Sequence, residues 1–232
     1  ASNNVALGYN SLGANTTGTE NTAVGSVALQ DNTTGQRNTA VGYYAMEANT
    51  TGVYNDGIGA YALGKNTTGV ENSAHGYSAL WNNTTGSSNV AVGGRALTTN
   101  STANDNTAVG YHAMYDNTTG DKNVGIGASA LANNTTASQN TAVGYYSLNA
   151  NTTGQQNVAL GYQSMRLNET GSYNCAVGYD SLEANTTGAQ NTATGNHSLT
   201  ANTTGSLNSA FGNGALDANT TGSHNSALGH NA

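Results

Sequence analysis

The sequence predicts an all-β protein, a parallel β-solenoid (β-roll) with one 17-residue coil per repeat. From Asn4 to His224 the chain consists of thirteen consecutive 17-residue units without insertion or deletion, and a partial unit follows at 225–232. Helical repeats are typically about twice as long, whereas a unit of this length suits two short strands and two tight corners. Only 36% of the residues are hydrophobic and 7% are charged. Globular domains have roughly 45–50% and 25%, so a thick conventional core is excluded.

The composition narrows the class of protein further. The chain has 31 Gly, no Pro and a net charge of −7, whereas disordered chains are typically rich in Pro, Lys and Glu. Its five Lys and Arg residues form no basic cluster, so nucleic acid is not an expected partner. No apolar run approaches the ~20 residues of a membrane span. We therefore expect a single repeat domain over 1–232, which opens in the middle of the pattern and so belongs to a longer fibre.

The repeat unit reads N-T-A-V-G-Y-x-A-L-x-x-N-T-T-G-x-x, and we number its positions 1 to 17 and the coils from Asn4. Position 1 is Asn and position 5 is Gly in every unit. Positions 2–4 and 7–9 are the predicted strands, because β-branched or small residues are bounded there by Gly and Asn. N-T-T-G predicts a corner in which Asn bonds a backbone N–H and Gly supplies a positive φ. The second corner is expected at the position 5 Gly or at the join between units.

Stacking of identical coils places each residue type above itself. The Asn residues at positions 1 and 12 should form hydrogen-bonded ladders, and positions 3, 4, 8 and 9 should form a thin apolar core. Charged residues gather at positions 7, 10, 11, 16 and 17, which should therefore face solvent. Where position 3 shrinks to Gly57 or Gly125, position 4 is Ile58 or Ile126, which predicts that volume is conserved within the coil. Burial of one Val and one Leu per coil does not offset the entropy of ordering the whole coil, so we expect a homo-oligomer.

The motif N-T-A-V-G, with its variants N-V-A-L-G and N-S-A-L-G, resembles the head repeats of trimeric autotransporter adhesins. The whole unit is similar to repeats of phage tail-fibre-like and bacterial surface proteins. The resemblance covers essentially the whole chain and implies a homotrimer that projects from a cell or virion. It implies an extracellular fibre segment, a shaft or adhesive head for a cell-surface or glycan receptor. The adhesin-head unit is typically shorter than the unit of this chain, so the coil shape can differ. Open sheet edges at the ends of a solenoid also favour end-to-end filaments.

Every complete unit contains an N-x-T sequence, which is a glycosylation acceptor in a suitable host and also a pattern typical of a structural corner. Both interpretations stay open at this point. The candidate glycosylation residues are Asn15, Asn32, Asn49, Asn66, Asn83, Asn100, Asn117, Asn134, Asn151, Asn168, Asn185, Asn202 and Asn219.

Position 6 alternates between Tyr and a smaller residue through the first nine coils. This spacing indicates a binding or interchain stripe, or a history of duplicated pairs of units in which Tyr packs over its small neighbour. The candidate stripe residues are Tyr9, Tyr43, Tyr77, Tyr111, Tyr145, Tyr162 and Tyr179. The Thr columns at positions 13 and 14 favour a different class, an ice-binding (antifreeze-type) solenoid. Adjacent strand residues point to opposite faces, so only one of these columns could contact ice.

Nothing in the sequence predicts an enzyme, a metal site or a cofactor. The His residues occupy unrelated repeat positions without metal-ligand spacing. Asp180 and Glu183 are predicted to be a solvated surface pair, and Cys175 a small strand residue without a disulfide partner. Trp81 is a lone aromatic residue at a variable position and could contact a sugar. The five histidines are His75, His112, His197, His224 and His230.

Overall fold

The computed structural model describes residues 2–232 and confirms a parallel β-solenoid of about 13 turns of roughly 17 residues. Among the described residues there is no helix, and hence none that could cross a membrane. The chain forms two compact units, one ending at Thr119 and one spanning Gly120–Ala232. The strands of the first unit are β1 (Val5–Leu7), β2 (Thr22–Val24), β3 (Thr39–Val41), β4 (Asp56–Ile58), β5 (Ser73–His75), β6 (Val90–Val92) and β7 (Thr107–Val109). Those of the second are β8 (Val124–Ile126), β9 (Thr141–Val143), β10 (Val158–Leu160), β11 (Cys175–Val177), β12 (Thr192–Thr194), β13 (Ser209–Phe211) and β14 (Ser226–Leu228).

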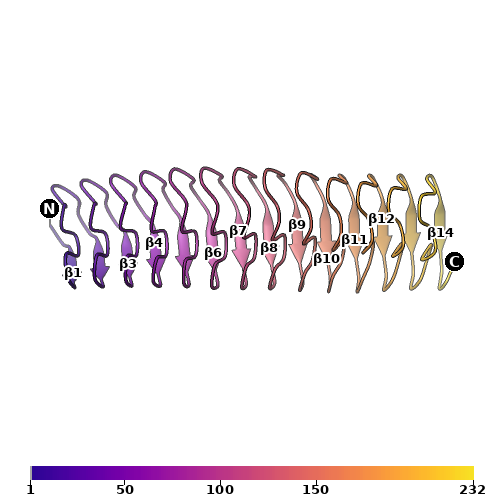
Figure 1. Ribbon diagram of the computed structural model, residues 1–232, viewed down its shortest axis with the longest axis horizontal. Helices are drawn as coiled ribbons and strands as arrows, with labels where there is room; N and C mark the ends of the chain where they lie inside the picture. Colours follow the sequence, from indigo (N-terminus) through magenta and orange to yellow (C-terminus); the bar gives the residue numbers. More distant parts are fainter. Residues whose placement is uncertain (1) are drawn as a thin grey trace. The chain divides into compact units, whose positions relative to one another are not determined.

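Within each unit, consecutive strands pair in parallel with identical repeat positions in register. In the first unit, β2 pairs with β3 through Ala23 and Ala40. In the second, β9 pairs with β10 through Ala142 and Ala159. Figure 1 shows that the strands of each unit lie side by side, with one loop of chain leading from each strand to the next. The repeat positions are therefore true columns of the structure.

Each coil contains one strand, so the prediction of a second strand at positions 7–9 is wrong. This segment is a run of turns in which Tyr44 and Met46 have φ of 55° and 51°. Extended strands need negative φ, which these left-handed residues do not have. Left-handed backbone also occurs at position 17, as at Tyr54 with φ 58°, and at the position 5 Gly, as at Gly59 with φ 131°. The chain thus turns at both of the places expected for the second corner.

The two predicted Asn ladders are confirmed. At position 1, the backbone N–H of Asn38 donates to Oδ1 of Asn21 at 3.0 Å, and its side-chain Nδ2 donates to the carbonyl of Gly52 at 2.8 Å. At position 12, Nδ2 of Asn49 donates to Oδ1 of Asn32 at 2.8 Å and to the same Gly52 carbonyl at 3.2 Å. Both ladders thus converge on the carbonyl of position 15 in each coil. Buried polar groups are stable in a core only when they are paired in this way.

The N-T-T-G corner forms, but its Asn and Gly act differently from the prediction. The Asn amide reaches forward to the position 15 carbonyl, as Asn32 does to Gly35 at 3.1 Å. The Gly provides space, because a Cβ on Gly52 would lie 2.5 Å from the carbonyl oxygen of Gly69 in the next coil. Ala103 replaces this Gly in coil 6, and its carbonyl still accepts both Asn amides.

The apolar core consists of positions 3, 8 and 9. Ala40, Ala45 and Met46 represent these positions in coil 3, and none of them is exposed. Position 4 was predicted to belong to the core, and that prediction is wrong, because Val92 is 37% exposed and Ile58 is 40% exposed. Successive residues of a strand point to opposite faces. With position 3 directed inward, positions 2 and 4 must face outward.

The predicted exchange of volume between positions 3 and 4 is wrong for the same reason. Gly57 is buried whereas Ile58 is exposed, and beside Gly125 the side chain of Ile126 is 38% exposed. The space at Gly57 is filled by the preceding coil instead. A Cβ there would lie 2.8 Å from Cγ of Met46. Close packing is thus maintained between adjacent coils.

Candidate functional site

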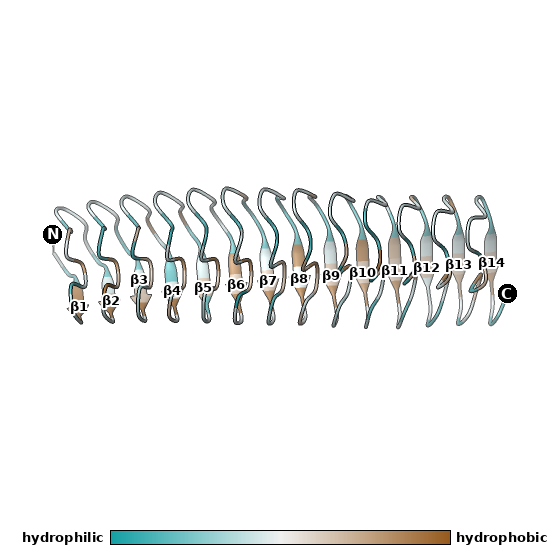
Figure 2. Ribbon diagram, viewed as in Figure 1, coloured by the Kyte–Doolittle hydropathy of each residue, from teal (hydrophilic) through white to brown (hydrophobic). Residues whose placement is uncertain are grey.

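The outward residues of the strands form a repeated surface on each unit, which we call the strand face; its position 4 is apolar in all strands but β5 and β12, whereas its position 2 is mostly Thr or Ser. It comprises positions 2 and 4 of every coil, among them Val90 and Val92, each 37% exposed, and Phe211, 43% exposed. Asp56 and His75 are the only Asp, Glu, Lys, Arg or His residues in β1–β14. They lie 3.1 Å apart, between His75 Nε2 and Asp56 Oδ2, so their charges compensate when His75 is protonated. Figure 2 shows most strands in white to brown, whereas β4, which contains Asp56, is teal.

The predicted tyrosine stripe at position 6 lies on the surface. Its members are 42% (Tyr162) to 80% (Tyr9) exposed. In the second unit, the ring centroids of Tyr145 and Tyr162 are 5.5 Å apart and those of Tyr162 and Tyr179 are 5.1 Å apart, with planes inclined by 19° and 5°. These three rings stack as one column. The remaining predicted members, also exposed, are Tyr43, Tyr77 and Tyr111.

In the first unit the alternation of position 6 has a packing basis. A Cβ on Gly94 would lie 3.6 Å from Cδ2 of Tyr111, so this ring lies over its small neighbour. The packing interpretation of the stripe therefore holds at this pair. Binding by the stripe stays a prediction.

Coils 4 and 5 contain an aromatic cluster that the sequence reasoning missed. The ring centroid of Tyr61 lies 6.0 Å from that of Tyr77 and 6.2 Å from that of Trp81, with planes inclined by 89° and 62°. These three rings and Ser78 line a surface pocket of about 310 Å³. The residues belong to positions 6, 7 and 10 of neighbouring coils. Reading these three columns together, rather than one at a time, would have indicated the cluster.

The candidate glycosylation residues lie inside the coils. Of the thirteen, those from Asn32 to Asn202 are not exposed at all, and Asn15 and Asn219 are half-buried. Nδ2 of Asn83, for example, donates to Oδ1 of Asn66 at 2.8 Å and to the carbonyl of Gly86 at 2.9 Å. A glycan on this nitrogen would replace one donated proton and need space that the ladder occupies. The structure therefore favours the corner interpretation of N-x-T, and an intact mass of native material tests it.

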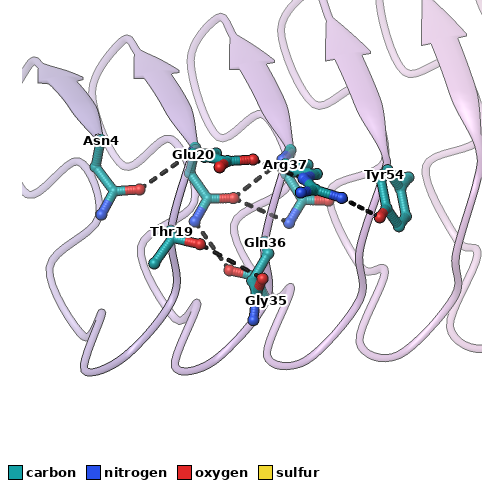
Figure 3. A network of polar contacts seen from close by, with 9 residues as sticks. Asn4, Thr19, Glu20, Gly35, Gln36, Arg37 and Tyr54 are labelled. Carbon is teal, nitrogen blue, oxygen red and sulfur yellow. Dashed lines mark hydrogen bonds and ion pairs between the residues drawn. The ribbon is translucent and has the colours of Figure 1, made fainter. Parts of the chain in front are cut away.

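Polar contacts between coils extend over the surface at positions 16 and 17, as Figure 3 shows. Arg37 Nε lies 2.6 Å from Glu20 Oε2, and its Nη1 donates to the Tyr54 hydroxyl. The hydrogen bond to Glu20 is the main cause of the raised pKa of Arg37. Thr19 Oγ1 donates to Gln36 Oε1 at 3.4 Å. The position 17 charges of Glu20 and Arg37 are thus paired with each other.

The histidine and carboxylate candidates are dispersed. His112 lies between the rings of Tyr111 and Tyr115, with centroids at 4.0 and 4.7 Å, and burial is the main reason that its pKa is lowered. Among the described residues, no group of three His, Cys, Asp or Glu could hold a metal ion. His75 pairs with Asp56 on the strand face, His197 contacts Tyr179, and Cys175 is half-buried with a free thiol. His224 and His230 are exposed.

Asp180 and Glu183 differ from the simple solvated pair that the sequence predicts. Glu183 accepts from Arg166 Nε at 2.8 Å. Asp180 is half-buried, and its Oδ1 is buried without a hydrogen-bond partner. Burial is the main cause of the raised pKa of the Asp180 carboxyl.

Comparison with protein-family models, with curated proteins and with solved structures gives no match.

Proposed function

We propose that this chain is a segment of an extracellular structural or adhesive fibre, and that it associates with further copies of itself through the strand face. The observation that supports the proposal is that this charge-poor face places an apolar residue at the outward position 4 of nearly every coil. Contiguous apolar surface of this kind is typical of protein–protein contacts. The sequence resemblance favours a homotrimer on a cell surface or virion. The function requires no catalytic residue, metal or cofactor.

The small number of apolar side chains in the core also favours association. In coils 2 to 12, the largest fully buried apolar side chain of the core is one Leu or Met, such as Met46 or Leu63. Covering the valines of the strand face would roughly double the number of buried β-branched or larger apolar side chains per coil. Each such side chain contributes about 1.5–3 kcal/mol when it is fully removed from water.

Adhesion would follow from repetition. An oligomer of identical solenoids presents the same tyrosine stripe many times, so weak individual contacts combine into a high avidity. A receptor on a cell surface or a glycan would be engaged at several coils simultaneously. Electron microscopy of purified material should show rods or filaments, and a globular outline would contradict the proposal.

Association through the strand face is tested by placing charged residues on that face. Sedimentation equilibrium of the wild type should give a multiple of the 23.3 kDa chain mass. The double variant Val24→Lys/Val41→Lys places two cations on β2 and β3 and should dissociate to the monomer. Ser88→Lys is the matched control, because position 17 carries Lys naturally at Lys122. A monomeric wild type at high concentration, or a control that dissociates equally, contradicts the proposal.

Ice binding is the second candidate, because the Thr residues at position 14 form an exposed rank through all complete coils, from Thr17 to Thr221. The neighbouring position 13 is engaged internally, as Thr50 Oγ1 donates to the carbonyl of Thr67 at 3.1 Å. The rank is one residue wide and lies at a bend rather than on a strand, which makes this function second to fibre assembly. Thermal hysteresis of the protein solution decides: a measurable freezing-point gap supports ice binding, and its absence removes it.

A further inference from the structure

The pocket at coils 4 and 5 has walls formed by three aromatic rings in different orientations. Tyr61 stands nearly perpendicular to Tyr77 and is inclined by 62° to Trp81, and the buried Ser78 also lines the pocket. The volume of about 310 Å³ is at the lower end of the range of about 300–1,000 Å³ for small-molecule sites. It therefore suits a ligand of one or two small rings.

The indole of Trp81 is held in place by the coil before it. Gly64 occupies the same repeat position as Trp81, and a Cβ there would lie 2.8 Å from Cδ1 of the indole. Any larger residue at Gly64 would displace the ring. On the same coil, Lys65 Nζ lies 4.7 Å from the Trp81 ring centroid, a cation–π distance. The ring is thus packed on Gly64 and Lys65 and remains half-exposed.

The surroundings of the pocket favour an anion, although the chain has a net charge of −7. Lys65 makes no ion pair among the described residues, and neither does Arg95, which occupies the repeat position of Ser78 in the next coil. The backbone N–H of Arg95 donates to the carbonyl of Tyr77 at 2.8 Å, which fixes its coil directly beside the pocket. The acidic residue Glu47 belongs to the same column as Trp81 but lies two coils earlier. Gly64 of coil 4 separates the two residues. Lys65 is therefore an uncompensated cation beside three aromatic rings.

We propose that this pocket binds an acidic pyranose, a uronic acid unit of a glycan, with its ring against Trp81 and Tyr77 and its carboxylate beside Lys65. The C–H bonds of a pyranose face pack on aromatic rings, and an amphipathic ring such as Tyr or Trp accepts such a ligand while staying partly wet. A carboxylate near an ammonium group forms a charge-assisted contact that a neutral sugar cannot form. The site goes beyond the fibre function, because it occurs at one pair of coils and does not depend on association of the chain.

The test uses the fluorescence of Trp81, which is the only Trp in the sequence. The full chain is titrated with methyl β-D-glucuronide and, separately, with methyl β-D-glucoside, which differ only in the carboxylate. The glucuronide should produce a saturable change with a Kd of about 1 mM, an affinity typical of a single weak site. The glucoside should bind about three- to fivefold more weakly, as expected for the loss of one partly exposed charged contact. No saturable change with either sugar, or equal affinities, would overturn the proposal.

The repeat supplies substitutions that the coil already accommodates. Position 11 is Ala in several coils, so Lys65→Ala should fold and should lower the glucuronide affinity to that of the glucoside without changing the glucoside affinity. Position 6 is Ala in coils 4 and 8, so Tyr77→Ala should fold and weaken both sugars about tenfold, the loss of one ring contact of about 1–1.5 kcal/mol. Tyr145→Ala makes the same change on the second unit and is the matched control. Equal weakening by Tyr145→Ala, or an unchanged preference in Lys65→Ala, would refute the assignment.

Discussion

Replacing Asn83 by Ala should lower the stability of the folded protein by about 3–5 kcal/mol, more than most surface substitutions. Asn83 is fully buried in the position 12 ladder. Its Nδ2 donates to Oδ1 of Asn66 and to the carbonyl of Gly86, and its Oδ1 accepts from Nδ2 of Asn100 at 2.9 Å. The substitution therefore removes three hydrogen bonds from a site without access to water.

The magnitude follows from what each partner retains. The Gly86 carbonyl keeps a hydrogen bond from Asn72 at 2.9 Å, and Asn100 keeps its bond to the carbonyl of Ala103 at 3.2 Å. Among the residues that the structure describes, Oδ1 of Asn66 has no other donor, so it is left unsatisfied. A net loss of about 1 kcal/mol for each hydrogen bond, with about 1–3 kcal/mol for a stranded buried acceptor, gives the stated range after partial relaxation.

Asn83→Asp should be more destabilising than Asn83→Ala near neutral pH. The new carboxylate oxygen would face the two oxygens to which Nδ2 now donates, and burial opposes its charge. Its pKa in the folded state would be raised above the unfolded value of about 3.9. Stability is then lost as the pH rises through the folded pKa and is recovered below the unfolded pKa, where the protonated group donates one hydrogen bond.

The measurement is urea unfolding followed by far-UV circular dichroism, combined with native-state hydrogen exchange because repeat arrays can unfold in parts. Asn82→Ala is the matched control: it is the same chemical change one residue earlier, at position 11, where Ala occurs naturally as at Ala48. This control should change stability by less than about 0.5 kcal/mol. If the two variants have similar stability, or if Asn83→Asp is insensitive to pH, the ladder does not contribute as described.

Two further predictions concern the backbone and the carboxylates. Gly59→Ala should prevent its coil from forming, because its φ of +131° is a conformation that L side chains rarely adopt. Gly69→Ala should reduce stability less: its Cβ would lie 2.3 Å from the Gly86 carbonyl oxygen, but its φ is not positive and the coils already accommodate Ala at position 15 in Ala103 and Ala137. Circular dichroism of the two variants distinguishes them. Asp180→Asn and Glu47→Gln should each stabilise the protein at pH 7 by up to about 1 kcal/mol, since burial is the main cause of the raised pKa of both carboxyls. A raised pKa in the folded state means that the folded state binds protons more readily than the unfolded state. The stability of the wild type should therefore increase as the pH falls from 7 toward the unfolded pKa. The urea midpoint of the double variant Asp180→Asn/Glu47→Gln should lack this part of the increase.

The sequence predicts the coil length, the first strand, both Asn ladders and the turn at the position 5 Gly, because each of these depends on one invariant residue type at one spacing. The burial of position 4 is predicted wrongly, because its Val and Ile residues are apolar whereas the alternation along the strand directs them outward. Ile58 shows the consequence: it is apolar and exposed beside the buried Gly57.

The segment at positions 7–9 could not be predicted from residue preferences. Leu is a poor candidate for left-handed backbone, yet Leu29 has φ 51° and is fully buried. Hydrogen bonds between coils impose this conformation, as the N–H of Leu29 donates to the carbonyl of Ala45 at 3.0 Å. The aromatic pocket escaped notice because it joins three columns of adjacent coils, and only the stacked coils bring Tyr61, Tyr77 and Trp81 together.

The left-handed residues have a consequence for how the protein folds. Each complete coil has such residues at positions 7, 9 and 17, nearly all of them non-glycine, and each costs roughly 1 kcal/mol or more relative to ordinary backbone. The compensating hydrogen bonds come from the adjacent coil, so an isolated coil has the penalty without the compensation. Folding should therefore resemble the growth of a crystal, in which a new layer takes its conformation from the layer already present. The first contact between two coils sets the rate, and each added repeat increases stability without raising that barrier.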